Sequence, residues 1–173
     1  AYNLMWEGNL FQDMVRTRWG YGAFQHDKSK FYNWLTLGVQ LNIQDFTAEL
    51  DYYWGERTMD YGSVVGNTDM GARYVRDQSA SVNLKYNFGK WRPFIKGIWG
   101  QRHDNDLKSD AYQNFGVQAV VEYYPFTQPL VKDLRFHFMY GYNSTDFQGQ
   151  FSQLSNQDDH TILLGTRWLF KAK

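Results

Sequence analysis

Cysteine is absent from this chain of 173 residues, and proline occurs only three times. Without cysteine the chain can form no disulfide, no thiolate nucleophile and no zinc–thiolate site. Proline removes a hydrogen-bond donor from a sheet, so its scarcity leaves long segments free to form continuous strands. Pro125 and Pro129 flank one short segment, which predicts a connection there.

The chain also lacks an excess of charge and any long apolar run. Its 18 Lys and Arg residues balance 18 Asp and Glu residues, so bulk charge indicates no nucleic-acid partner. No run of about 18 apolar residues occurs, which excludes a transmembrane helix. No nucleotide fingerprint, Gly-rich phosphate loop or paired His/Glu helix motif is present. We therefore expect no cofactor, no metal site and no enzymatic activity.

What the chain does have is an alternation of apolar and polar residues with period two. Between 46 and 54, every second residue is apolar or aromatic, and the intervening residues are mostly polar. A strand with this pattern has one apolar and one polar face. Aromatic residues make up 19% of the chain although the mean hydropathy is −0.63, a combination typical of a membrane barrel with a polar interior.

The alternating runs predict eight long strands, at 14–25, 31–41, 46–57, 77–88, 91–102, 111–124, 132–144 and 160–170. Each has about 11 residues or more, enough for a tilted strand to cross a bilayer. Turns are expected at 42–45, 87–90 and 125–131, and loops at 26–30, 58–76, 103–110 and 145–159. We expect a single domain over 1–173, an all-β transmembrane antiparallel up-and-down barrel, closed at eight strands or part of a larger barrel.

The first 13 residues do not fit the same alternation. Tyr2, Leu4, Trp6 and Leu10 lie on even positions, whereas the next strand is apolar at odd positions. A turn or bulge is therefore expected between Gly8 and Asp13. Residues 1–13 form either an N-terminal segment or a ninth strand. Because bacterial single-chain barrels have even strand numbers, a ninth strand would indicate part of a larger barrel.

The predicted outward face sorts its aromatic residues by depth. Aromatic residues lie near both strand ends, with aliphatic residues between them, as a bilayer requires of a barrel exterior. The loop-side belt comprises Trp19, Tyr21, Phe31, Tyr52, Trp54, Trp99, Phe115, Tyr140 and Tyr142. The turn-side belt comprises Phe46, Tyr86, Phe88, Trp91, Tyr123, Trp168 and Phe170. A soluble sandwich would have no reason to separate its aromatic residues in this way.

The predicted inward face carries more bases than acids. Its candidate lumen-lining residues are Arg16, Arg18, Glu49, Asp51, Lys85, Lys96, Glu122, Arg135, His137 and Arg167. In a closed eight-strand barrel these groups would form a buried ionic network without a water channel. In a wider barrel the same residues would line a lumen that favours anions.

Three histidines lie at the loop-side ends of the predicted strands. His26, His103 and His160 could assemble a hydrolase or acyltransferase site with nearby serines and acids. Those neighbours are Asp27, Ser29, Asp104 and Ser109. Their spacing matches no motif, and polar loop tips commonly carry these residue types. An outer-leaflet lipid-modifying enzyme is accordingly the minor alternative.

Two sets of residues resemble known outer-membrane proteins. Gly165 followed by Trp168 and Phe170 resembles the C-terminal assembly signal of outer-membrane barrels. Segments 31–39, 51–54, 122–126 and 133–136 resemble the C-terminal half of phosphate-selective-porin-like proteins of Gram-negative bacteria. This resemblance implies a porin-like role and a chain that is part of a longer protein.

The sequence thus predicts an integral protein of the Gram-negative outer membrane. Its expected role is passive passage of small solutes, mainly anions, with outer-membrane lipids as partners. The main alternative is a closed eight-strand barrel that acts as a structural or surface-binding protein through its loops. Whether the protein has a protein partner or forms an oligomer is left open by the sequence.

Overall fold

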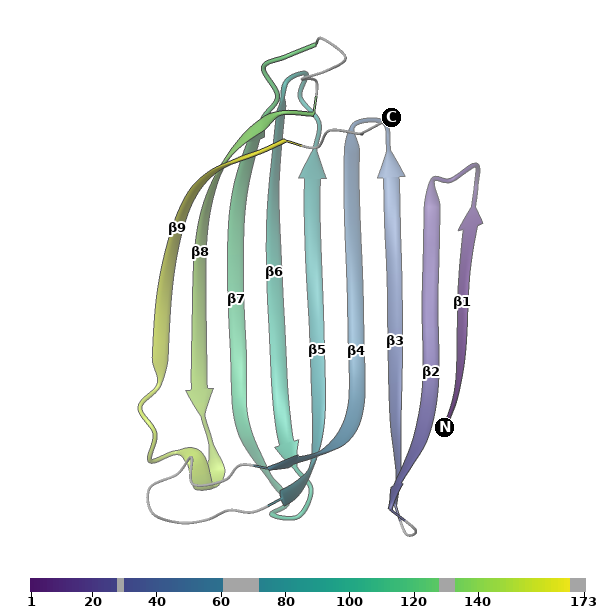
Figure 1. Ribbon diagram of the computed structural model, residues 1–173, viewed down its shortest axis with the longest axis vertical. Coiled ribbons are helices and arrows are strands. Elements are labelled where there is room, and N and C mark those ends of the chain that lie inside the picture. The colour runs from purple at the N-terminus through teal and green to yellow at the C-terminus, as the bar shows by residue number, and fades with distance from the viewer. Residues whose placement is uncertain (28–29, 61–71, 128–132, 169–173) are drawn as a thin grey trace.

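The computed structural model describes residues 1–27, 30–60, 72–127 and 133–168. They form one antiparallel sheet of nine strands, in which each strand pairs with the next along the chain (Figure 1). The strands are β1 (Tyr2–Leu10), β2 (Val15–Asp27), β3 (Lys30–Ile43), β4 (Phe46–Asp60), β5 (Ala72–Tyr86), β6 (Trp91–Asp104), β7 (Ser109–Tyr123), β8 (Arg135–Phe147) and β9 (Gln157–Arg167). A 3-10 helix, η1 (Gly149–Phe151), lies between β8 and β9.

All eight predicted strands are present, but the expected number of eight is one too low. The N-terminal segment supplies the ninth strand, β1, which pairs with β2 along its whole length. β5 begins at Ala72 rather than at 77, because the β4–β5 hairpin continues to the pair Asp60 and Ala72. Tyr74 and Val75 are consecutive apolar residues there, and Arg73 and Arg76 lie on opposite faces, so alternation carries no signal. Much of the predicted loop 58–76 and of the turn 125–131 falls outside the described residues.

A tight turn between β1 and β2 explains the change of alternation near the N-terminus. Phe11, Gln12 and Asp13 all have positive φ, between 53° and 66°. This left-handed turn brings Trp6 opposite Trp19, so both indoles lie on the same face with their ring centroids 6.4 Å apart. The predicted turn or bulge between Gly8 and Asp13 is confirmed. Apolar residues at even positions on β1 and at odd positions on β2 therefore lie on the same face of the sheet.

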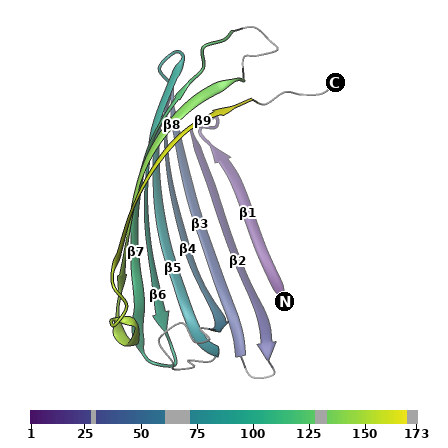
Figure 2. The ribbon, with the colours of Figure 1, turned by 60° about the vertical axis from the view of Figure 1, so that its left-hand side comes forward.

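The sheet is open in the part of the chain that the structure describes. Its strand order starts at β1 and ends at β9, and these two edge strands are not paired with each other. Figures 1 and 2 show β1 and β9 at opposite edges of a curved wall. The closed barrel expected from the sequence is therefore not confirmed. Since every pair is antiparallel, β1 and β9 run in the same direction.

One face of this sheet is apolar and is the more exposed of the two. In β7, Phe115, Ala119 and Val121 on the apolar face are exposed, whereas Gly116, Val120 and Glu122 on the other face are buried. Leu37, Leu50 and many other large apolar side chains are similarly open. An ordinary soluble sheet covers its apolar face, so this arrangement is the reverse of the usual one.

The described hydrophobic core is small and lies at the loop end of the sheet. Phe151 of η1 packs against Val75 and Ala111, with Leu107 and Leu154 beside them. Within the predicted loop 145–159, η1 therefore folds back onto the sheet, and the outer residues of this range extend β8 and β9. No helix among the described residues is long and apolar enough to cross a membrane.

Candidate functional site: the polar face of the sheet

The backbone register places all ten candidate lumen residues on the same face. Arg16, Gln40 and Glu49 are direct neighbours on β2, β3 and β4, and the same row continues to Asn83, Lys96 and Gln118 on β5, β6 and β7. Nearer the turns, Glu122 lies opposite His137, and Arg135 opposite Arg167. That this face lines a lumen stays a prediction.

Arg18 is the centre of the first charge cluster on this face. Its Nη2 donates to Glu49 Oε1 at 2.9 Å and to Asp51 Oδ1 at 2.6 Å. Gly38, on the strand between them, makes this contact sterically feasible, since a Cβ there would lie 2.6 Å from Arg18 Nε and from Asp51 Oδ1. The arginine side chain is 54% exposed. The cluster is therefore hydrated, and its ion pairs contribute little to stability.

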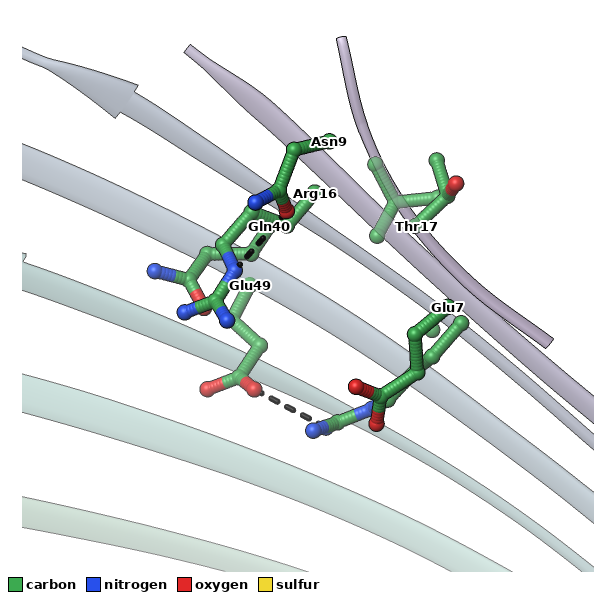
Figure 3. Close-up of a pocket in the computed structure, with 9 residues that line it drawn as sticks. Glu7, Asn9, Arg16, Thr17, Gln40 and Glu49 are labelled. Atoms are coloured by element: carbon green, nitrogen blue, oxygen red, sulfur yellow. Dashed lines mark hydrogen bonds and ion pairs between the residues drawn. The ribbon is translucent and has the colours of Figure 1, made fainter. Parts of the chain in front are cut away.

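A pocket of about 100 Å³ lies beside this cluster, lined by residues of β1 to β4. Figure 3 shows Glu7, Asn9, Arg16, Gln40 and Glu49 around it. Arg16 Nε donates to Asn9 Oδ1 at 3.2 Å. The lining carries both charges and amides, so the pocket can hold water or a small polar solute, and no nucleophile–base pair faces it.

A second cluster, at the loop end, contains an acid that the sequence analysis missed. Asp77 on β5 accepts from Arg57 Nη2 at 2.7 Å and from Arg102 Nε at 2.7 Å. Arg102 is nearly buried, with its guanidinium 5.0 Å from the centre of the Tyr112 ring. Asp77 is the first residue of the predicted strand 77–88 and follows the parity of Ser79, Ser81 and Asn83, so alternation could have placed it on the polar face.

A third cluster lies at the turn end, and Tyr124 is its missed member. Arg135 Nη1 lies 3.0 Å from Glu122 Oε1 and donates to the Tyr124 hydroxyl at 2.7 Å. The same hydroxyl donates to Glu122 Oε2 at 3.0 Å. The Arg92 guanidinium stacks 4.1 Å above the Tyr124 ring. Tyr124 is the last residue of the predicted strand 111–124 and shares the parity of Glu122, so alternation indicates the polar face for it, although β7 ends at Tyr123.

The loop-side histidines have separate partners where they are described. His103 Nδ1 lies 2.8 Å from Asp110 Oδ1, and His160 Nδ1 lies 2.9 Å from the Tyr140 hydroxyl. Asp104 accepts from the backbone N–H groups of Asp106 and Leu107, which gives it a local structural role. The side chains of His26 and Asp27 and the whole of Ser29 lie outside the described residues. Within the described part of the chain, no three His, Cys, Asp or Glu residues could hold a metal ion.

Comparison with models of known protein families found no match, and comparison with curated proteins found none either.

Proposed function

We propose that this chain is part of the wall of a transmembrane β-barrel in the outer membrane of a Gram-negative bacterium. The observation that carries the proposal is the order of residues on the exposed apolar face. Leu84, Ile95 and Ala119 are neighbours in one aliphatic row across β5, β6 and β7. Nearer the loops, Tyr52, Trp99 and Phe115 share a row, and nearer the turns Trp91, Tyr123 and Phe136 share another. An aliphatic band between two aromatic rows matches a bilayer.

The further proposal is that the polar face lines a water-filled passage. Nine strands already exceed the eight whose interior is filled by side chains alone. Because β1 and β9 run in the same direction, closure by antiparallel pairing requires an odd number of further strands. Both edge strands are long, with nine residues in β1 and eleven in β9, and neither contains proline, so further strands can pair with their open edges. We therefore infer a barrel of ten or more strands, wide enough for hydrated groups such as Arg18.

The excess of bases on the polar face favours small anions as solutes. Lys85 and Lys96 have no acid partner within the described residues, so their charge acts on a passing ion. The open sheet of nine strands does not favour the closed eight-strand barrel. The separate histidine partners do not favour the lipid-modifying enzyme.

Conductance in planar lipid bilayers tests the proposed passage. The full protein should form channels whose reversal potential in a salt gradient shows anion preference. Lys96→Gln should reduce that preference without loss of folding, because this lysine has no ion pair to lose in the described part of the chain. Correctly folded protein that gives no conductance would contradict the proposed passage.

A further inference from the structure

The middle of the polar face is hollowed where its side chains are small. Ser79 of β5 lies directly opposite Gly100 of β6 on this face. A Cβ at Gly100 would meet only the backbone oxygen of Gln78, at 3.8 Å, so the space above this glycine is open. Two hollows, of about 580 and 460 Å³, adjoin here and share Ser79 and Tyr53 in their lining. The larger one, which we call the loop-side hollow, is lined by residues of β4 to β9 and has the size of a small-molecule site.

Aromatic rings stand on both sides of the loop-side hollow. Tyr53 of β4 lines one side, and its side chain lies along its own strand over Gly55, where a Cβ would collide with the tyrosine hydroxyl. Tyr112 of β7 and Phe147 of β8 line the other side, with their ring centroids 6.5 Å apart. Tyr53 is 38% exposed, so its ring is accessible from the water side of the sheet.

The packing of the loop end holds the second pair of rings in place. Tyr112 and Phe147 both pack against the small core around Phe151. The Arg102 guanidinium lies 5.0 Å from the centre of the Tyr112 ring. A site whose groups are fixed before a ligand arrives loses less conformational entropy on binding. This side of the hollow is therefore preorganised.

The charged groups of the hollow are paired with one another and still offer hydrogen-bonding atoms. Asp77 forms ion pairs with Arg57 and Arg102, the two bases of the described lining. Asn114 Nδ2 donates to Asn143 Oδ1 at 2.9 Å and to the backbone oxygen of Ser144 at 3.2 Å, which leaves Asn114 Oδ1 as the acceptor that this amide can offer a ligand. Donors beside acceptors suit hydroxyl groups, because each hydroxyl both donates and accepts.

We propose that the loop-side hollow is a binding site for a neutral sugar, and this proposal rests on the proposed passage for access of the solute. A sugar ring has a face of C–H groups and a rim of hydroxyls. The C–H face can stack on the ring of Tyr53, whose π-face is electron-rich. The hydroxyls can bond to Arg57, Asp77 and Asn114. An ionic ligand would instead have to compete with Asp77 for the arginines, which favours an uncharged one.

Calorimetric titration of the refolded full protein tests this site, in a zwitterionic detergent without sugar head groups. Glucose and galactose are the probes, and at least one of them should bind saturably. Sorbitol, the open-chain alcohol of glucose, keeps the hydroxyls but has no ring face to stack. It should bind at least about fivefold more weakly than the preferred sugar. No saturable binding of either sugar, or equal binding of sorbitol, would overturn the sugar site.

Two glycines of β6 on opposite faces provide a matched pair of variants. Gly100→Leu places a side chain in the open space of the hollow and should abolish sugar binding. Gly97→Leu adds the same side chain on the apolar face, where a Cβ meets nothing within 4 Å, and should leave binding unchanged. Circular dichroism checks that both variants keep their strands. Equal effects of the two substitutions on binding would contradict the placement of the sugar.

A second pair of variants tests the stacking contact itself. Tyr53→Ala should raise the dissociation constant of the sugar at least about fivefold, because the ring is lost. Tyr53→Phe keeps the ring and should leave the constant close to that of the unchanged protein. Tyr52→Ala removes the neighbouring tyrosine, which lies on the apolar face, and should have no effect. An unchanged dissociation constant in Tyr53→Ala would overturn the stacking contact.

The sugar site and the proposed passage can fail separately. A protein that gives no conductance but binds sugar with these dependences would contradict the passage and retain the site. Channels that conduct chloride, formed by a protein that binds neither sugar, would retain the passage and overturn the site. Adenosine serves as a planar aromatic probe in the same titration. Tighter binding of adenosine than of either sugar would assign the hollow to aromatic ligands and overturn the sugar.

Discussion

At the scale of single residues, the two faces of a strand should respond differently to the same substitution. Ala119 and Gln118 are adjacent on β7, and they lie on the apolar and the polar face respectively. Ala119 sits in the aliphatic row beside Ile95, where the account places the middle of the bilayer. Gln118 lies beside Lys96 on the polar face.

Ala119→Arg should therefore destabilise the protein by roughly 2 to 4 kcal/mol in lipid, because a charge at the bilayer midplane loses its hydration. Gln118→Arg should cost far less, since its side chain would project into water. Unfolding titrations in lipid vesicles measure both free energies. Equal costs at the two positions would refute the assignment of the faces.

Acids of the polar face should also differ in how much their replacement destabilises the protein, although all of them follow the same alternation in the sequence. The Glu122 side chain is 10% exposed and that of its partner Arg135 is 22% exposed, whereas Arg18, the partner of Glu49, is 54% exposed. Glu122→Gln leaves a largely buried arginine without its counter-charge and should cost about 3 kcal/mol or more. Glu49→Gln should cost less than about 1 kcal/mol, because Arg18 is hydrated and keeps Asp51.

Denaturant titration of the two variants in the same lipid checks this difference. A similar small loss for both would mean that water reaches the Glu122 cluster as freely as it reaches Arg18. A similar large loss for both would mean that the polar face is dry, which would count against a water-filled passage.

At the scale of elements, alternation located β2 to β9, but it left open whether residues 1–13 form a strand, and it did not define every strand end. It identified the strands because their two faces differ in polarity over most of their length. It failed at the start of β5, where Tyr74 and Val75 are consecutive apolar residues and the contrast between the faces disappears. It also could not reveal that η1 places Phe151 against Val75 and Ala111, because that contact joins residues far apart in sequence.

The candidate site was predictable to the same extent. Parity alone placed Arg18, Glu49 and Asp51 on one face, but which charges pair depends on register, and register depends on turn geometry. The three residues with positive φ at Phe11–Asp13 are an example, since they bring β1 into line with β2 despite its opposite parity.

The connections predict which end of the sheet faces the cell exterior. The long β4–β5 connection and the β8–β9 connection with η1 lie at one end, and three of the four connections at the other end are the short segments 11–14, 44–45 and 87–90. Outer-membrane barrels usually have their longer connections on the outside. A cysteine introduced at Ser152 should react with a membrane-impermeant thiol label on intact cells. A cysteine at Phe88, which is 69% exposed in a turn, should react only after the cells are opened. Labelling of position 88 on intact cells would reverse the orientation.

The loop end should depend on Phe151, whose aromatic ring forms most of the small core there. Phe151→Ala should destabilise the protein by about 3 kcal/mol or more, because the substitution removes a buried ring that its neighbours cannot replace. Limited proteolysis should then cleave the 148–156 connection faster. Leu154→Ala, at the margin of the same cluster, is the control and should have a smaller effect. Equal protease resistance in the unchanged protein and Phe151→Ala would mean that this packing does not hold the connection.

At the scale of the whole molecule, the sheet of the proposed barrel is a wall between lipid and water. On the exposed apolar face, aliphatic and aromatic residues are ordered by depth. The polar face carries hydrated charges and ion pairs. In the proposed barrel, further strands pair with the open edges β1 and β9, and the shared direction of these two strands requires an odd number of further strands for antiparallel closure. A larger barrel with lipid outside and water inside would explain the exposed apolar face, the charge clusters on the polar face and the open edges together.

The most direct test is a spin-label scan along β7, from Gln113 to Val121, in lipid vesicles. Each residue is replaced in turn by cysteine and labelled, and relaxation by oxygen, which concentrates in lipid, is compared with relaxation by a water-soluble nickel chelate. Odd positions from Phe115 to Val121 should be accessible to oxygen, and even positions from Asn114 to Gln118 to the nickel chelate, with a period of two. Oxygen and nickel accessibilities that rise and fall together along β7, or equal nickel accessibility on both faces, would contradict the account.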